Sequence, residues 1–191
     1  MKGLQEVREK REGTLRLLTQ GEITLAHEMF GGAIAYNRVW VHCDSYLPFG
    51  LQAQNYGMAP NGELYFRKNL YEEDFSEIAV PTESKHLYIH EMVHVWQHQR
   101  GMWVRTRGLF SWASDYTYTL HANKKLKDYA MEQQACIIAD YWLWRKHGYN
   151  MWLYQRQAVP GRIVNYRGKD NSRNIFLVYQ KMVSRALAGR G

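Results

Sequence analysis

The sequence predicts an α+β fold that is predominantly helical, with a small N-terminal β-sheet packed beside a histidine-bearing helix. Three segments, residues 82–100, 125–148 and 174–189, have the apolar pattern of helices. Two shorter stretches before them, residues 33–43 and 63–66, have the pattern of strands. A chain of 191 residues, 46% of them hydrophobic, is long enough to bury one core, so we expect a single domain over the whole chain.

The N-terminus should be a tail followed by a helix. Residues 1–13 are a mixed charge run without an apolar centre, which predicts a solvated tail and no signal peptide. A helix should run from about Glu22 to the Gly31–Gly32 pair, because apolar side chains recur on one face and glycine commonly ends helices.

Two short strands are expected next. Residues 33–43 alternate, with Val39 and Val41 on one face. The turn residues Pro60-Asn61-Gly62 precede a second strand, Glu63–Phe66. We expect this second strand to be the edge that receives an extended substrate, because strand edges recruit peptides through main-chain hydrogen bonds.

Helices should form most of the remaining chain. The first begins at Thr82, whose side chain is the expected cap, and stops at Gly101. The second runs from about Lys125 to Gly148. The third, within residues 174–189, is amphipathic. Its expected buried face consists of Ile175, Val178, Met182 and Ala186.

Composition narrows the class of protein. The formal net charge of +7 predicts attraction to acidic partners such as an anionic cell-wall polymer, but no nucleic-acid-binding motif accompanies it, so no specific nucleic acid is expected. Cys43 and Cys136 should be two separate buried residues and not a disulfide framework. No apolar stretch approaches the length of a membrane span.

The most informative motif lies in the stretch LYIHEMVHVWQHQRG, which contains His90, Glu91 and His94. Helix positions four apart differ by about 40° around the axis, so the two imidazoles project from one side and can bind one Zn²⁺. Glu91 lies about 100° round from His90, where its carboxylate can reach a water activated by the metal. The motif predicts a zinc hydrolase with Glu91 as the catalytic base.

A catalytic zinc site needs a third protein ligand and one open position. The better candidate is Glu132, which lies in the middle of the next predicted helix on a segment with an apolar side, where a lone carboxylate would need a partner. His86 and His98 extend the histidine stripe by one turn in each direction. A third ligand on the same short helix would strain tetrahedral geometry, so we expect both to be surface or capping residues.

Two supporting roles also have candidates. A metal-bound histidine usually donates its other ring N–H to an acceptor, and Asp140 is the candidate, unless it instead caps the helix or pairs with Arg145. Tyr118 and Tyr129 are candidate hydrogen-bond donors to the oxyanion of the reaction, with packing as the alternative role.

Four segments together resemble the vgr-related proteins, in the order LTQGEITLAHEMFGGAIAYNRVWVH, MAPNGELYF, HEMVHVWQHQRG and YAMEQQA. The similarity covers about residues 15–145. The family consists of zinc metallopeptidases from bacterial contractile-secretion settings such as type VI secretion and Rhs loci. The resemblance implies a zincin-like, gluzincin-like domain with His90, His94 and Glu132 as zinc ligands and Glu91 as base.

The same resemblance implies an effector or toxin made in the bacterial cytoplasm without a Sec signal. A contractile secretion system would deliver it to the periplasm or to a target cell. Its expected partners are a carrier in the secretion apparatus, or an immunity protein that neutralises it, and a peptide or protein substrate.

Three functions remain open from the sequence. The leading one is a metallopeptidase that hydrolyses a peptide or protein. In the second, the same site hydrolyses peptidoglycan, because the basic charge would attract an anionic wall polymer and the Trp and Tyr rings can stack on sugars. The third is a non-catalytic binding module in which zinc only joins two helices, with a fourth ligand from His98, His121 or Cys136.

Overall fold

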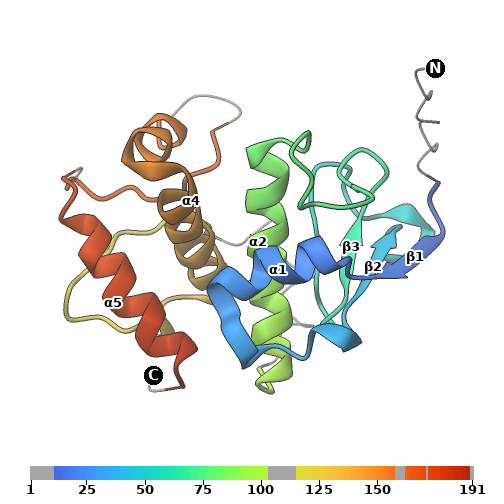
Figure 1. Ribbon diagram of the computed structural model, residues 1–191, viewed down its shortest axis with the longest axis horizontal. Coiled ribbons are helices and arrows are strands. Elements are labelled where there is room, and N and C mark those ends of the chain that lie inside the picture. Colours follow the sequence, from blue (N-terminus) through green and yellow to red (C-terminus); the bar gives the residue numbers. More distant parts are fainter. Residues whose placement is uncertain (1–10, 103–114, 158–161, 171, 190–191) are drawn as a thin grey trace.

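The helix that carries the histidines lies at the centre of the molecule, between the sheet and the C-terminal helices (Figure 1). The structure is a computed structural model that describes residues 11–102, 115–157, 162–170 and 172–189, so most of the predicted tail lies outside the described residues. In chain order, the helices and strands are β1 Thr14–Leu17, α1 Gln20–Phe30, β2 Trp40–Cys43, β3 Leu64–Phe66, α2 Thr82–Gln99, α4 Met131–Gln155 and α5 Ile175–Leu187.

Helix α1 begins earlier than predicted because a capping box starts it. The Thr19 hydroxyl accepts a hydrogen bond from the backbone N–H of Glu22 at 3.0 Å, and the Glu22 carboxylate accepts one from the backbone N–H of Thr19 at 2.9 Å. Glu22 is fully buried and also forms a two-pronged ion pair with Arg16, both contacts being 2.8 Å. This buried pair ties β1 to the start of α1.

The sheet has the order β1-β2-β3, with β1 antiparallel and β3 parallel to β2. Val39 and Val41 are buried, as the alternation predicted. Strand β3 is not a free edge, because the backbone of Tyr65 already exchanges two hydrogen bonds with Met58 on its outer side. The expectation that β3 receives a substrate strand is therefore wrong, and the segment around Met58 forms that border instead.

The helix ends differ from the sequence prediction in two places. The cap of α2 is Pro81, and Thr82 is already helical with no side-chain cap bond, so the expected Thr82 cap is wrong. Helix α4 begins at Met131 instead of near residue 125, because residues 126–128 form a separate 3₁₀ turn. At Gly148, the predicted end of this helix, a φ of 84° and a ψ of 172° interrupt the helical backbone, and a second helical segment continues across this kink to Gln155.

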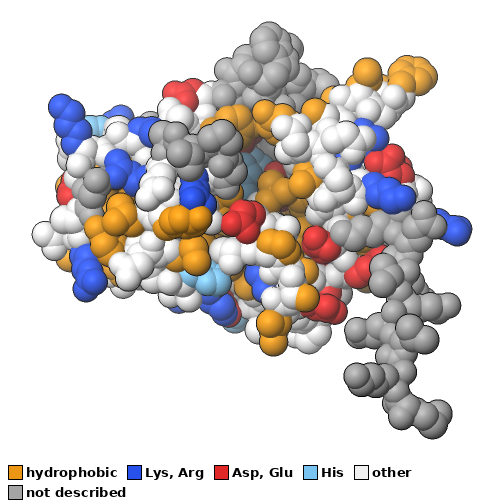
Figure 2. All heavy atoms as spheres, turned by 90° about the horizontal axis from the view of Figure 1, so that it is seen from above, with side chains coloured by type: hydrophobic (Ala, Val, Ile, Leu, Met, Phe, Trp, Pro, Cys, Tyr) orange, Lys and Arg blue, Asp and Glu red, His pale blue; other side chains and the backbone are white. Residues whose placement is uncertain are grey.

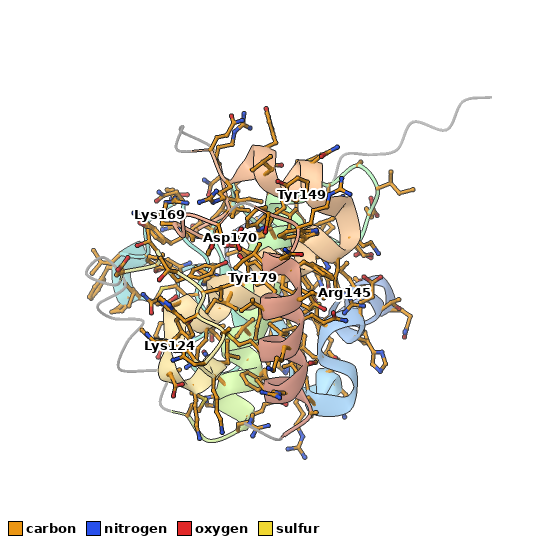
Figure 3. The ribbon with its side chains drawn as sticks, turned by 90° about the vertical axis from the view of Figure 1, so that its left-hand side faces the viewer. Lys124, Arg145, Tyr149, Lys169, Asp170 and Tyr179 are labelled. Atoms are coloured by element: carbon orange, nitrogen blue, oxygen red, sulfur yellow. The ribbon has the colours of Figure 1, made fainter. Side chains whose placement is uncertain are left out.

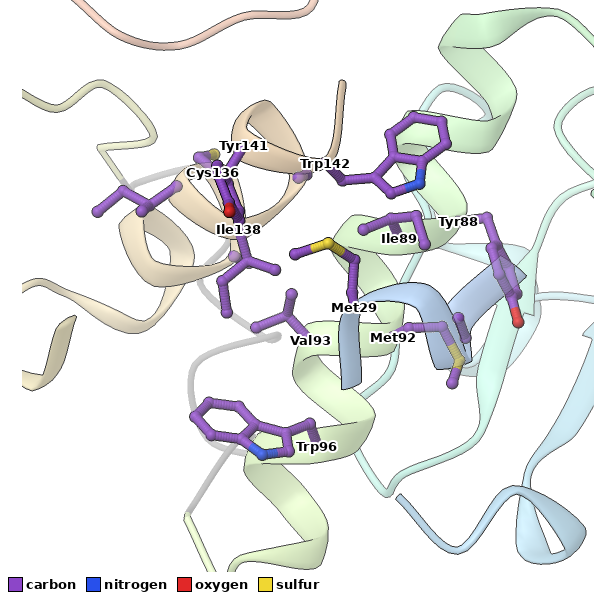
Figure 4. Close-up of a cluster of buried hydrophobic side chains, with 14 of the residues drawn as sticks. Met29, Tyr88, Ile89, Met92, Val93, Trp96, Cys136, Ile138, Tyr141 and Trp142 are labelled. Carbon is purple, nitrogen blue, oxygen red and sulfur yellow. The ribbon is translucent and has the colours of Figure 1, made fainter. Parts of the chain in front are cut away.

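The core forms where α2 packs against α4. Figure 4 shows Ile89 and Val93 of α2 facing Ile138 and Trp142 of α4, with Met29 of α1 beside them. Side chains from α5, among them Tyr179 and Met182, extend the same core beyond α4. Because α2 and α4 are locked together by apolar contacts, polar side chains along their seam are held at fixed separations.

Two expectations about composition can be compared with the structure. Cys43 and Cys136 are both free and buried, as predicted. Among the described residues, there is no helix with the length and apolar character that a bilayer crossing requires.

Candidate metal centre

Helices α2 and α4 bring together the three side chains that the sequence singled out as ligands. The Nε2 atoms of His90 and His94 lie 3.3 and 3.1 Å from the same Oε2 atom of Glu132. The ligand atoms of all three residues lie within 4.8 Å of one another, the only such group of at least three residues found in the described part of the chain. The two imidazoles come from successive turns of α2, and the carboxylate crosses from α4.

These distances fit one zinc ion. Two donor atoms bound to zinc at about 2.0–2.1 Å in tetrahedral geometry lie about 3.3–3.4 Å apart, close to the observed separations between the imidazoles and the carboxylate. Two imidazoles and one carboxylate are also a ligand set that zinc accepts. The three residues could therefore hold the ion and leave a fourth position open.

The electrostatics of the group match this interpretation. Burial by itself would lower the pKa of His94, but the Glu132 carboxylate, together with Glu91 and Gln97, raises that pKa to about 9. Burial likewise opposes the ionisation of Glu132, yet His94 and His90 hold its pKa well below the ordinary range. The carboxylate is thus stabilised as an anion by positive charge, which a metal ion would supply more strongly.

Glu91 lies beside these ligands and has an unusual environment. It is 3% exposed, and its Oε2 atom is buried with no hydrogen-bond partner among the described residues. Burial raises the pKa of its carboxyl group, against the opposing charges of His94 and His90. A buried carboxylate oxygen without a partner is costly, so its presence in the cavity of the metal centre points to a bound water or substrate atom as its partner.

Gly57 sets the position of Glu91 by close approach. A Cβ atom at Gly57 would lie 2.9 Å from Oε1 of Glu91 and 2.9 Å from Cε1 of Phe66, both too close. Only glycine therefore lets the chain pass over the carboxylate. Nothing in the local sequence pattern distinguishes this glycine from one in an ordinary turn.

The other ring nitrogen of His94 is held by a residue that sequence reasoning missed. Nδ1 of His94 lies 2.8 Å from Oε1 of Gln97, whose Nε2 donates to the Met131 carbonyl and to Oε1 of Gln134. Because the amide nitrogen of Gln97 is committed to α4, its oxygen faces His94 and accepts the Nδ1 proton. In the metal-free chain Nε2 also shares a proton with Glu132; when that proton is lost, this tautomer presents the Nε2 lone pair to a metal ion. The spacing of three residues on one helix face was the available signal.

Asp140 does not contact a ligand histidine, so that expectation is wrong. Its carboxylate lies 2.8 Å from Nε2 of His86, and it accepts hydrogen bonds from the Tyr118 hydroxyl at 2.6 Å and the Asn165 backbone N–H at 2.9 Å. Nδ1 of His90 lies 3.9 Å from Sγ of Cys136 instead. Asp140 reaches away from the ligands because it lies two turns beyond Glu132 on α4.

The two tyrosines expected as oxyanion donors are used elsewhere. The Tyr118 hydroxyl is buried between Asp140 and Tyr179, and the Tyr129 hydroxyl donates to the Thr119 carbonyl. Neither lines the cavity of the metal centre. Tyr116 does line it, with its ring centroid 6.2 Å from that of His90, and burial raises the pKa of its hydroxyl. Spacing could not single it out within an aromatic-rich stretch.

The remaining candidate ligands lie outside the group. His98 is exposed and packs against Gly62, and His121 is exposed beside the Thr119 hydroxyl. Cys136 faces the Nδ1 side of the His90 ring, opposite the nitrogen that points to Glu132. Among the described residues, none of these supplies a fourth ligand, an arrangement typical of an open site.

The metal centre opens into a cavity of about 500 Å³. One border is the segment 55–60 next to β3, another is the start of α2, and residues 162–165 close a third. Figure 2 shows a hollow in the surface, seen from above, with histidine side-chain atoms at its floor. The cavity is thus large enough for a short piece of a polymer beside Glu91 and the candidate ligands.

The chain is similar to a known protein in both sequence and fold. No protein-family model matches it. The sequence is 42% identical over an alignment of 135 residues to the type VI secretion system spike protein VgrG2b of Pseudomonas aeruginosa PAO1, and the match covers 67% of this chain. The matched region is 13% of that relative's length. The solved effector domain of Pseudomonas aeruginosa VgrG2b superposes with a TM-score of 0.62 at 32% identity, over 85% of this chain and 89% of that chain.

Proposed function

Because this chain belongs to the family of the VgrG2b effector domain, within the vgr-related proteins of type VI secretion, we propose that it is a zinc-dependent peptidase effector. One observation carries the proposal. Glu132 of α4 lies within 3.1–3.3 Å of both histidines of the motif on α2, beside the buried Glu91, whose Oε2 atom has no hydrogen-bond partner among the described residues. The proposed fold relationship is zincin-like, with Glu132 in the place of a gluzincin's third ligand.

The proposed chemistry divides between the ion and the side chains. A zinc ion held by His90, His94 and Glu132 would supply Lewis acidity toward a carbonyl group and a water molecule. Glu91 accepts the proton of the attacking water and later passes it to the leaving amine. Burial raises the pKa of its carboxyl group, which makes the carboxylate a stronger base than an exposed glutamate. Gln97 holds the His94 ring in the tautomer that binds metal.

The substrate would enter along the segment 55–60. Met58 in this segment already pairs with Tyr65 of β3, so the sheet supports the border of the cavity from behind. The Tyr116 hydroxyl lines the same cavity and is the candidate donor to the carbonyl oxygen of the substrate. An extended peptide fits this border better than a bulky folded surface.

Delivery follows from the same family relationship. VgrG2b is named a spike protein of the type VI secretion system. We propose that this chain is likewise carried by a secretion apparatus and acts in the periplasm or in a target cell.

The first test measures zinc per chain by elemental analysis. We expect one zinc in the wild type and in Glu91→Gln, and loss of zinc in Glu132→Ala. Absence of zinc from metal-replete wild type would remove the enzyme proposal. One zinc retained by Glu132→Ala would assign the third ligand to another residue.

The second test measures cleavage of unfolded casein and of purified peptidoglycan. Glu91→Gln should lower turnover at least about a hundredfold. The chain supplies a matched control, because His27-Glu28-Met29 of α1 repeats the residues of His90-Glu91-Met92 and Glu28 is exposed. Glu28→Gln should leave turnover unchanged. Muropeptide release without casein cleavage would favour peptidoglycan as the substrate.

A further inference from the structure

A second cavity, separate from the metal centre, has a strongly one-sided charge. It has a volume of about 800 Å³ and lies between α5, the 122–127 loop and the end of α2. We call it the α5 groove. None of its lining residues lines the cavity of the metal centre. A ligand of the α5 groove would therefore bind without occupying the catalytic cavity.

Six cationic side chains and no carboxylate line the α5 groove. They are Arg100, Lys124, Lys125, Lys127, Lys181 and Arg185. No ion pair involving any of the six is found within the described part of the chain. Six cations that form no ion pair with the described residues raise the potential of the groove, so its ligand should carry negative charge.

The floor of the α5 groove is apolar. Val178, Met182 and Ala186 recur every four residues on α5 and form one stripe. Leu126 and Trp96 complete the floor and are 3% and 4% exposed. The ligand therefore needs an apolar surface as well as negative charge.

The charges flank the apolar stripe on two sides. Lys181 and Arg185 run parallel to the stripe on α5, and Lys124, Lys125 and Lys127 surround Leu126 on the facing loop. Figure 3 looks onto α5 with Lys124 on the neighbouring loop. The complement of this arrangement is a helix with a row of apolar side chains bordered by carboxylates.

From this complementarity we propose that the α5 groove binds an acidic amphipathic helix of a partner protein. The apolar row of that helix inserts between α5 and the 122–127 loop, and its carboxylates pair with the cations on both rims.

Two other anionic partners fit less well. Single-stranded nucleic acid needs exposed rings on which its bases stack, whereas Trp96 on the groove floor is 4% exposed. A membrane surface is flat, and most apolar side chains of the groove lie at the floor of a concave surface, out of its reach. A helix can insert side chains into such a concavity.

The test uses the full chain and a fluorescein-labelled synthetic helix with one leucine stripe flanked by glutamates. Binding is followed by fluorescence anisotropy. Lys181→Glu/Arg185→Glu should weaken binding at least about tenfold, because both side chains are exposed and line the groove. Arg38→Glu/Lys169→Glu makes the same change in net charge on exposed residues outside the groove and should leave binding unchanged.

Two further peptides separate specific from general attraction. In one peptide lysines replace the glutamates, and in the other the leucines are dispersed around the helix. Both should bind at least about tenfold more weakly than the acidic amphipathic peptide. Zinc content and thermal unfolding of the groove variant should match the wild type, which shows that the fold is retained.

Several results would overturn the proposal. The proposal is wrong if the acidic helix does not bind the wild type. It is also wrong if the groove variant and the control variant lose the same amount of binding affinity. If the peptide with dispersed leucines bound as tightly as the acidic amphipathic helix, net charge alone would explain the binding. Phosphatidylglycerol vesicles or oligothymidine are added as competitors. If either one displaces the labelled helix at a lower concentration than the unlabelled acidic helix does, the groove would be assigned to a lipid surface or to nucleic acid.

Discussion

The carboxylate of Asp140 on α4 lies 2.8 Å from Nε2 of His86 on α2, one helical turn before the candidate ligand His90. The carboxylate is fully buried and accepts two further hydrogen bonds, from the Tyr118 hydroxyl and from the Asn165 backbone. It therefore joins α2, α4 and two loops at one point. Its expected role is to stabilise the fold next to the metal centre, without supporting a zinc ligand directly.

Replacing Asp140 with Asn should lower the free energy of unfolding by about 2–3 kcal/mol, because a buried anion with three hydrogen-bond donors loses its charge. Zinc affinity should change less than about threefold, since no ligand histidine contacts Asp140. Denaturant unfolding and competition with a zinc chelator measure the two quantities. A large loss of affinity with normal stability would contradict the assignment.

Gln97, unlike Asp140, should affect zinc affinity. Its amide oxygen lies 2.8 Å from Nδ1 of His94, so Gln97→Ala removes the acceptor that selects the metal-binding tautomer. We expect zinc affinity to fall about 10–100-fold. Chelator competition at fixed pH checks this, with Gln99→Ala as control on an exposed residue at the end of α2. Unchanged affinity in Gln97→Ala would mean that packing alone orients the ring.

Gly57 offers a test of how Glu91 is positioned. In Gly57→Ala the new methyl group would meet Oε1 of Glu91 at 2.9 Å and must displace the carboxylate. Turnover should fall about tenfold to a hundredfold while zinc content stays at the wild-type value. Gly32→Ala is the matched control, because no atom lies within 4 Å of a Cβ at Gly32. Full turnover in Gly57→Ala would show that Glu91 adapts without cost.

Without the metal, the stability of the fold should depend on pH through the ionisation of His94 and Glu132. In the metal-free chain the pKa of His94 is raised from 6.5 to about 9, chiefly by Glu132 acting against burial. Its contribution to stability is therefore fully present below pH 6.5 and lost as the pH rises through about 9. The pKa of Glu132 is depressed, so its contribution is present above the ordinary value of 4.5 and lost in acid.

The measurement is thermal unfolding of chelated and zinc-loaded protein between pH 6 and 9.5. The chelated protein should lose stability across this window, whereas zinc requires unprotonated His94 and should bind more tightly as the pH rises. Parallel curves for the two forms would argue against a metal at His94. Complete unfolding of the chelated protein throughout would indicate that the metal is required for the fold.

Much of the candidate site follows from local sequence. His90 and His94 share a face because an α-helix advances about 100° per residue, and Glu91 lies at the edge of that face for the same reason. Glu132 could be chosen because a carboxylate on an apolar helix needs a partner. The strand at residues 40–43 could also be predicted, because its side chains alternate between two faces. In the structure Val41 is buried and Trp40 before it is exposed, in agreement with that alternation.

Other features depend on contacts between distant parts of the chain. Strand β1 was not predicted because Leu15 and Leu17 are 55% and 45% exposed, so it has no buried face and exists by pairing with β2. Asp140 was assigned to the wrong histidine because its partner, His86, is 54 residues away and the choice depends on how α4 turns against α2.

The sequence by itself therefore determined that the two histidines and the candidate base Glu91 lie close together on one helix, because helical periodicity sets these positions within about one turn. Only the tertiary structure decided that Glu132 meets both histidines, that Gln97 and not Asp140 supports one of them, and that Gly57 passes over Glu91. These relationships depend on the packing of α2 against α4 and on the chain that borders β3, where separations of a few ångströms arise from contacts across the whole core.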